Sequence, residues 1–139
     1  MKTLISGLLL SVVCSLAVAD NESWVPVASI KSTGTEFSIK KGSGELLQNK
    51  AGESIYVVIG RDHSKKDSRV ELQKWYVRAQ DCQSKQGQLV SLSLKGEFLF
   101  ENDFVFNAGS VASTIAEAIC GAFEYNLKQQ AEEEDKKGI

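Results

Sequence analysis

The sequence predicts an α+β domain: an antiparallel β-sheet meander of five or six strands with one long C-terminal helix packed on one face. Between residues 24 and 106, apolar and polar side chains alternate over short segments separated by turns, which is typical of antiparallel strands. From Ser110 onward, the apolar spacing changes to that of a helix. Since neither layer can bury its apolar face alone, we expect the helix to cover one face of the sheet.

A secretory signal precedes this domain. Lys2 is followed by an apolar run at 4–16, and Ala17-Val18-Ala19 forms a small-residue cleavage site. The run is much shorter than the roughly 20 residues of a membrane-spanning helix. We therefore expect residues 1–19 to be a signal peptide, the exported chain to begin at Asp20, and no segment to remain in the membrane after cleavage.

Cys14, inside this leader, raises the alternative of a lipoprotein signal. Such a signal needs a small residue immediately before the modified cysteine and usually a leucine three positions before it. Those positions hold Val13 and Ser11. The sequence therefore favours a soluble periplasmic or secreted protein over a lipid-anchored one.

The chain length and net charge are those of a single domain that is weakly acidic. Without its leader the chain has about 120 residues, the size of a single domain, which we place at 20–131. The formal net charge is −2 for the whole chain, and it becomes about one unit more negative when Lys2 is removed. This charge gives no reason to expect nucleic acid or an anionic membrane as a partner. The charged segment 132–139 is expected to be a disordered tail.

Alternation and turn residues place the strands. We expect strands at 24–31, 35–40, 55–61, 70–80, 89–95 and 98–106. The glycine-containing segment 41–53 and the charged segment 62–68 are expected to be loops. Within the strand at 70–80, Trp75 and Tyr76 fall on opposite sides, so one of them must face the core.

The helix is expected to run from Ser110 to about Gln130. Its apolar stripe recurs at helical spacing, at Val111, Ile115, Ile119, Phe123 and Leu127. Thr114 and Glu117 resemble a capping box placed one turn inside the helix. Because the stripe is continuous, we expect Ile119 and Phe123 to be buried.

Cys82 and Cys120 are the two cysteines that follow the leader. In an oxidising compartment they allow only one intramolecular pairing. The alternative, a reactive thiol at Cys82, would need a nearby histidine or a positive environment. We expect Cys82 at a strand end and Cys120 in mid-helix, so their disulfide would tie the two layers together.

No grouping of side chains predicts catalysis, a cofactor or a metal site. His63 is the sole histidine, and a lone loop histidine beside lysines is expected to be solvated. The acidic run 132–135 could attract a cation, but consecutive carboxylates at a helix end are usually a solvated surface. Because no nucleophile–base pair is visible, we expect a protein without enzymatic activity.

Two stretches are candidates for contact with a protein partner. The first is the charged loop, with candidate residues Arg61, Asp62, His63, Lys65 and Lys66. The second is the strand Lys74-Trp75-Tyr76-Val77-Arg78, because tryptophan, tyrosine and arginine are residue types that anchor interfaces. From this second stretch we select Trp75, Tyr76 and Arg78. A core role for Trp75 or Tyr76 is the alternative.

Several short elements between residues 70 and 122 occur in a distinctive order. They are Lys74-Trp75-Tyr76-Val77, Asp81-Cys82, Phe106-Asn107-Ala108-Gly109-Ser110-Val111 and Ile119-Cys120. With the chain length and the export signal, these elements resemble the bacterial surface-adhesin protein E family. The resemblance implies an antiparallel sheet carrying a C-terminal helix, and binding to host extracellular-matrix and serum proteins. This chain departs from that family in lacking a convincing lipid-attachment cysteine, so a soluble periplasmic relative with another partner is an equal alternative.

The sequence thus predicts an exported, disulfide-stapled binding protein of the bacterial envelope, with another protein as its partner. The partner would contact the sheet surface or the loop between Arg61 and Arg69. A small periplasmic inhibitor or immunity protein is the alternative. It would block a hydrolase or effector by inserting the same loop into the active site.

Overall fold

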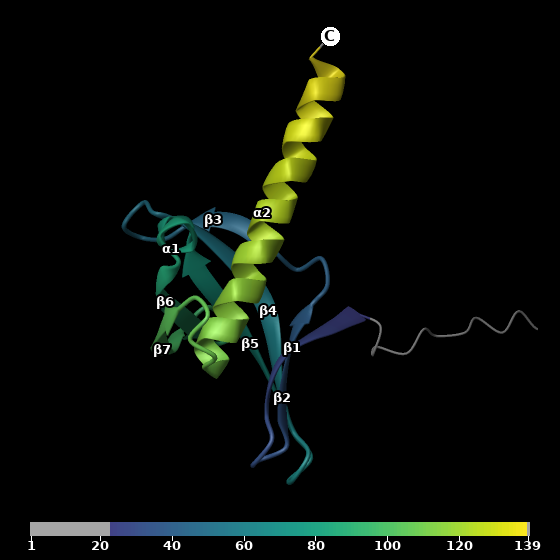
Figure 1. The fold of residues 1–139 in the computed structure, drawn as a ribbon, viewed down its shortest axis with the longest axis vertical. Helices are drawn as coiled ribbons and strands as arrows, with labels where there is room; N and C mark the ends of the chain where they lie inside the picture. The colour runs from purple at the N-terminus through teal and green to yellow at the C-terminus, as the bar shows by residue number, and fades with distance from the viewer. Residues whose placement is uncertain (1–22, 139) are drawn as a thin grey trace, which may run out of the picture.

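The computed structural model describes residues 23–138, in which one long helix crosses a twisted antiparallel sheet (Figure 1). The predicted leader, its cleavage site and Asp20 lie outside the described residues. In chain order the elements are β1 (Trp24–Ile30), β2 (Thr35–Lys40), β3 (Glu45–Gln48), β4 (Ser54–Ser64), β5 (Arg69–Arg78), α1 (Ala79–Ser84), β6 (Gln86–Leu92), β7 (Phe98–Val105) and α2 (Val111–Lys137). This arrangement confirms the predicted α+β fold class.

The strands follow the order β1-β2-β4-β5-β6-β7, and every pair is antiparallel. The short strand β3 lies off this path and pairs with the first residues of β4, whereas β2 pairs with the later ones. Strand β4 can hold two partners in succession on the same edge because it is 11 residues long. Within the described chain, β1 and β7 are left as the two ends of the strand order.

Two expected loops differ from the structure. The segment 41–53 contains β3, whose four residues are all exposed, so no buried alternation marks it in the sequence. Strand β4 continues through Asp62 and His63, and the expected loop 62–68 shrinks to a turn at 65–68. Backbone pairing extends this hairpin as far as Ser64 and Arg69, where charged side chains hide the strand pattern.

The end of β5 also differs from the prediction. The strand stops at Arg78, and the next six residues form α1, so Cys82 lies in a helix and not at a strand end. Lys85 ends α1 in the left-handed conformation, with φ at 60°. This reversal directs the chain straight into β6.

Helix α2 begins one turn before the predicted capping box. Ser110 is its N-cap, with a side chain that accepts a hydrogen bond from the Ser113 backbone N–H at 3.1 Å. Glu117 instead accepts a hydrogen bond from the Asn107 backbone N–H at 3.2 Å, which ties the preceding turn to the helix. The helix continues to Lys137, past the predicted end near Gln130 and through most of the segment expected to be a tail.

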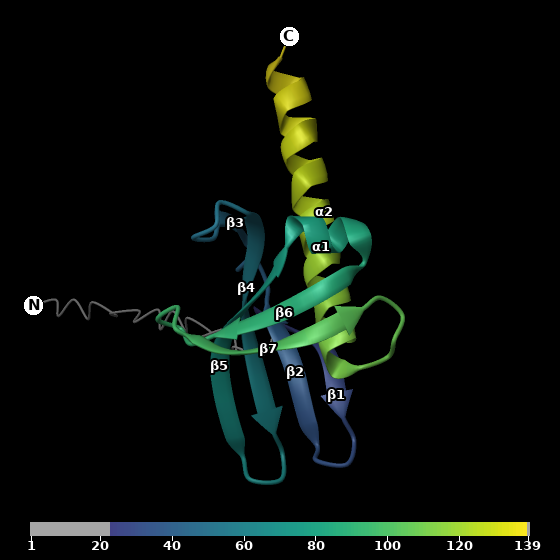
Figure 2. The same ribbon diagram turned by 90° about the vertical axis from the view of Figure 1, so that its left-hand side faces the viewer.

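The core lies between the sheet and roughly the first three turns of α2. The helix contributes Ile115, Ala116, Ile119 and Cys120, which pack on sheet residues that include Tyr56, Val58, Trp75, Val77, Leu89 and Phe104. Burial of Ile119 is confirmed. Phe123, however, is only half-buried, and Leu127 is 43% exposed. The prediction of a buried apolar stripe is wrong at these two positions because α2 extends beyond the sheet (Figures 1 and 2).

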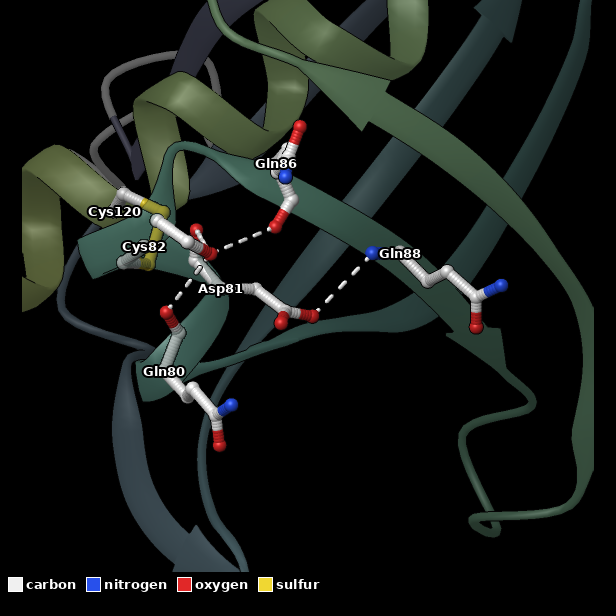
Figure 3. The surroundings of a disulfide bond; sticks show 7 residues. Gln80, Asp81, Cys82, Gln86, Gln88 and Cys120 are labelled. Carbon is white, nitrogen blue, oxygen red and sulfur yellow. Dashed lines mark hydrogen bonds between the residues drawn. A yellow bond between two sulfur atoms is a disulfide. The ribbon is translucent and has the colours of Figure 1, made fainter.

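The predicted disulfide is confirmed, and it joins α1 to α2 (Figure 3). Cys82 and Cys120 are both buried, with their Cα atoms 5.5 Å apart and a sequence separation of 38. Next to it, the Asp81 carboxylate accepts a hydrogen bond from the Gln88 backbone N–H at 3.4 Å. In the chain-entropy model, a loop of this length stabilises the fold by about 4 kcal/mol.

Candidate protein-binding surface

The residues predicted from the charged loop do not form one surface. Arg61 pairs with Leu72, and Asp62 pairs with Glu71, so the two lie on opposite faces of the sheet. Asp62 is on the face covered by α2, where it lines a cavity of about 350 Å³ beneath the start of the helix. His63 belongs to β4 and is half-buried.

Lys65 and Lys66 lie in the exposed turn between β4 and β5. The Lys65 backbone N–H donates a hydrogen bond of 3.1 Å to the Gly34 carbonyl oxygen in the turn between β1 and β2. The two turns therefore lie side by side, and together they project from the lower end of the sheet (Figure 2).

Arg61 is engaged in a contact across the sheet. Its guanidinium lies over the Trp24 ring, 4.6 Å from the ring centroid, at a strength of about 0.5–1 kcal/mol for an exposed cation–π pair. Ser38 of β2, which pairs with Arg61, is buried. The contact thus links β1 to β4 across β2, and Arg61 has a structural role here.

The structure decides the alternative left open for the aromatic strand. Trp75 is 3% exposed and belongs to the core, where its indole N–H donates to the Gln73 side-chain oxygen at 3.1 Å. Tyr76 lies on the face away from α2 and is half-buried. Arg78 forms ion pairs with Glu53 at 3.3 Å and with Asp81 at 3.6 Å.

Large apolar side chains are exposed together at the tip of the β6–β7 hairpin, which the sequence analysis did not select. Leu94, Phe98 and Leu99 form this cluster, here called the hairpin patch, and they are 46%, 62% and 45% exposed. Phe100, which is 46% exposed, instead lines the cavity beneath the start of α2. Three consecutive apolar residues at 98–100 break the strand alternation. They cannot all point into one core, which is the signal that could have revealed the patch.

Hydrogen bonds hold the tip of this hairpin. The Ser93 backbone N–H donates to the Glu97 carbonyl oxygen at 2.8 Å, and the Glu97 backbone N–H donates to the Ser93 hydroxyl oxygen at 3.0 Å. Gly96 takes a φ of 90°, which residues with a side chain rarely adopt. The hairpin patch is therefore displayed on a defined turn.

An open hollow of about 850 Å³ adjoins the hairpin patch. Phe98 and Leu92 line it on the hairpin side, and Tyr76 and Arg78 line it from β5. The turn between β3 and β4 closes the far side through Asn49 and its neighbours. Two residues of the predicted aromatic strand thus lie beside the hairpin patch.

Strand β7 also ends the strand order, next to the patch. The other end strand, β1, contains Pro26 and an irregularity between Pro26 and Ala28, both of which hinder the pairing of a further strand. No proline interrupts β7. Its exposed side includes Glu101 and Asp103, so a strand that adds there would meet negative charge.

No protein-family model, curated protein or solved structure matches this chain. Within residues 23–138, no three histidine, cysteine, aspartate or glutamate side chains are grouped so that they could hold a metal ion. No helix in the same range is long and apolar enough to cross a membrane. The hairpin patch and the hollow beside it are accordingly the basis of the functional proposal.

Proposed function

We propose that this chain is an exported, non-enzymatic binding protein of the bacterial envelope, and that it binds another protein through the hairpin patch. The exposure of Phe98 and its apolar neighbours Leu94 and Leu99 at the tip of one hairpin carries the proposal. Clustered apolar side chains at a surface are typical of protein–protein contact sites. Partner binding would remove them from water and so stabilise the complex.

The surroundings of the hairpin patch support a protein as the partner. Tyr76 and Arg78 line the adjoining hollow, and both residue types are enriched in the centres of protein interfaces. The open edge of β7 could also pair with an extended segment of the partner. An apolar centre with polar groups around it matches the usual organisation of such interfaces.

The second candidate is a small periplasmic inhibitor or immunity protein. The observation that favours it is the exposed turn at 65–68, which projects together with the turn between β1 and β2 (Figure 2). Lys65, Lys66 and Asp67 are its charged side chains. A narrow polar turn of this kind could enter the active-site cleft of a hydrolase or effector.

Site-specific photo-crosslinking in the bacterium that produces the protein would test both candidates. A benzophenone amino acid would replace Phe98 in the hairpin patch, Lys66 in the projecting turn, or Lys136 at the far end of α2 as the control. The leading proposal predicts a discrete crosslinked adduct from position 98 and none from position 136. Mass spectrometry of the adduct would identify the partner.

A matched pair of substitutions tests whether the crosslinked adduct depends on the hairpin patch. Leu94→Glu places a charge in the hairpin patch and should abolish the adduct formed from position 98, whereas Leu127→Glu on α2 should leave it intact. An adduct from position 66 alone, with a hydrolase or effector, would establish the inhibitor instead. Absence of an adduct from position 98 would contradict the leading proposal.

A further inference from the structure

A second hollow lies on the opposite face of the sheet from the first, between α2 and strands β1, β2 and β4. Its volume is about 490 Å³, within the roughly 300–1,000 Å³ of typical small-molecule sites. The walls are mostly apolar and include Val25, Val27, Ile39, Val58, Ala118 and Ala122. None of the residues of the hairpin patch lines it. This hollow is here called the helix groove.

Short side chains on α2 leave the helix groove open. Ala118 and Ala122 of α2 line it together with Val25 and Ile39, and each alanine side chain is a single methyl group. The helix groove is therefore a mostly apolar hollow that is open to solvent and accessible to a ligand.

One end of the helix groove is closed by a polar contact. The Asn126 side-chain amide donates a hydrogen bond to the Tyr56 hydroxyl oxygen, and both residues line the groove. A Cβ atom at Gly44 would clash with that hydroxyl oxygen. Glycine is thus required at position 44 for Tyr56 to reach Asn126.

Positive charge lies at the rim of the helix groove. Lys40 and Lys41 line it and are exposed, and no acidic residue is among its lining residues. Neither lysine takes part in an ion pair within the described residues. The chain as a whole has a net charge of −2, so this pair is a local exception that complements an anion.

We infer that the helix groove binds a single-chain fatty acid. The alkyl chain would lie along Ala118 and Ala122, and the carboxylate would meet Lys40 and Lys41. The volume of about 490 Å³ is in the lower half of the range of small-molecule sites, which favours one alkyl chain over the two of a phospholipid. This inference is independent of the partner proposed for the hairpin patch.

Titration of the purified exported chain with three twelve-carbon amphiphiles, below their micelle concentrations, would test the inference. Dodecanoate carries a negative headgroup, dodecanol a neutral one and dodecyltrimethylammonium a positive one. We expect saturable changes in the backbone NMR signals of Ala118 and Ala122, with dodecanoate binding the most tightly. Calorimetry would give the affinities.

Substitutions test the apolar part of the helix groove and its two lysines separately. Ala122→Leu fills the groove and should weaken dodecanoate binding at least 10-fold, and Ala118→Leu should do the same. Ala131→Leu, on the exposed end of α2, is the matched control and should leave binding unchanged. Lys40→Gln with Lys41→Gln should weaken dodecanoate about 5- to 10-fold, the scale of two exposed ion pairs, and leave dodecanol unchanged.

Three results would overturn the inference. They are the absence of saturable binding, signal changes confined to the hairpin patch, and equal affinity for the three headgroups. Thermal unfolding of each variant alone serves as the folding check. A groove-filled variant that unfolds at or above the parent temperature shows that its loss of binding comes from the filled groove.

Discussion

The ring of Phe123 packs against the ring of Tyr56, with centroids 5.2 Å apart, at the point where α2 leaves the sheet. Tyr56 is buried in the core, whereas Phe123 is only half-buried. Four residues further along, Leu127 is exposed. The pair therefore marks the boundary between the docked half of α2 and the half that projects.

This boundary predicts a graded response to truncation along α2. Ile119→Ala should lower the free energy of unfolding by about 2–5 kcal/mol, as expected for a fully buried side chain. Phe123→Ala should cost less than a core phenylalanine, about 1–3 kcal/mol, and Leu127→Ala should have almost no effect. Urea unfolding of the three variants beside the parent measures this gradient. Equal losses at all three positions would mean that α2 is docked along its whole length.

The disulfide between α1 and α2 should account for a large part of the stability. Replacing Cys82 and Cys120 together by alanine should lower the free energy of unfolding by about 4 kcal/mol. Reduced parent protein should unfold at about the same urea concentration as this variant. Intact mass after thiol alkylation, with and without reductant, checks the bond directly. Two free thiols in exported protein would contradict it.

Two glycines should respond oppositely to alanine. Gly121 lies in α2, where a Cβ atom would have open space around it, so Gly121→Ala should stabilise the protein by about 0.5–1 kcal/mol. At Gly87, a Cβ atom would clash with the Asp81 carboxyl group. Gly87→Ala should therefore displace Asp81 and cost about 1–3 kcal/mol. Thermal unfolding of both variants tests the contrast.

Asp62 should make stability fall as pH rises. Burial, and then the negative charge of Glu71, raise the pKa of the Asp62 carboxyl above its usual value of 3.8, while Arg69 acts against them. Between the unfolded and the raised folded pKa, the native state binds more protons than the unfolded state, so the contribution of Asp62 is most favourable below 3.8 and is lost above the folded pKa. The difference in free energy of unfolding between Asp62→Asn and the parent should therefore be more favourable to the variant at pH 7 than at acid pH. Urea unfolding at both pH values measures the difference, with Asp67→Asn in the exposed turn as the control.

The predicted leader has its own test. We expect the exported chain to begin at Asp20 and to carry no acyl group, because cleavage should follow Ala19. N-terminal sequencing and intact mass of protein from a periplasmic extract would show this. A lipid-modified chain beginning at Cys14 would contradict the prediction and strengthen the resemblance to surface adhesins.

Local patterns in the sequence determined most of the sheet, the existence of α2 and the cysteine pairing. Strands such as β2 and the first part of β4 have the alternation or the β-branched residues that a half-buried or buried strand requires. Two cysteines after the predicted leader leave a single intramolecular choice. Each of these inferences depends only on neighbours in sequence or on counting.

Tertiary structure decided the features that depend on which helix or strand packs against a given element. Trp75 and Tyr76 are adjacent and both aromatic, and only the position of α2 makes Trp75 the buried one. The exposed strand β3 exists because β4 extends beyond the end of β2 and offers it an edge.

The two candidate binding sites also depend on tertiary structure. The hairpin patch lies at the tip of the β6–β7 hairpin, and none of its residues belongs to the core under α2. The helix groove is lined on α2 by two alanines, whose side chains are short. Helical periodicity predicted an apolar stripe as far as Leu127, but the sheet beneath it ends near Phe123. Sequence spacing shows which side chains share a face, whereas burial depends on how far the opposing layer extends.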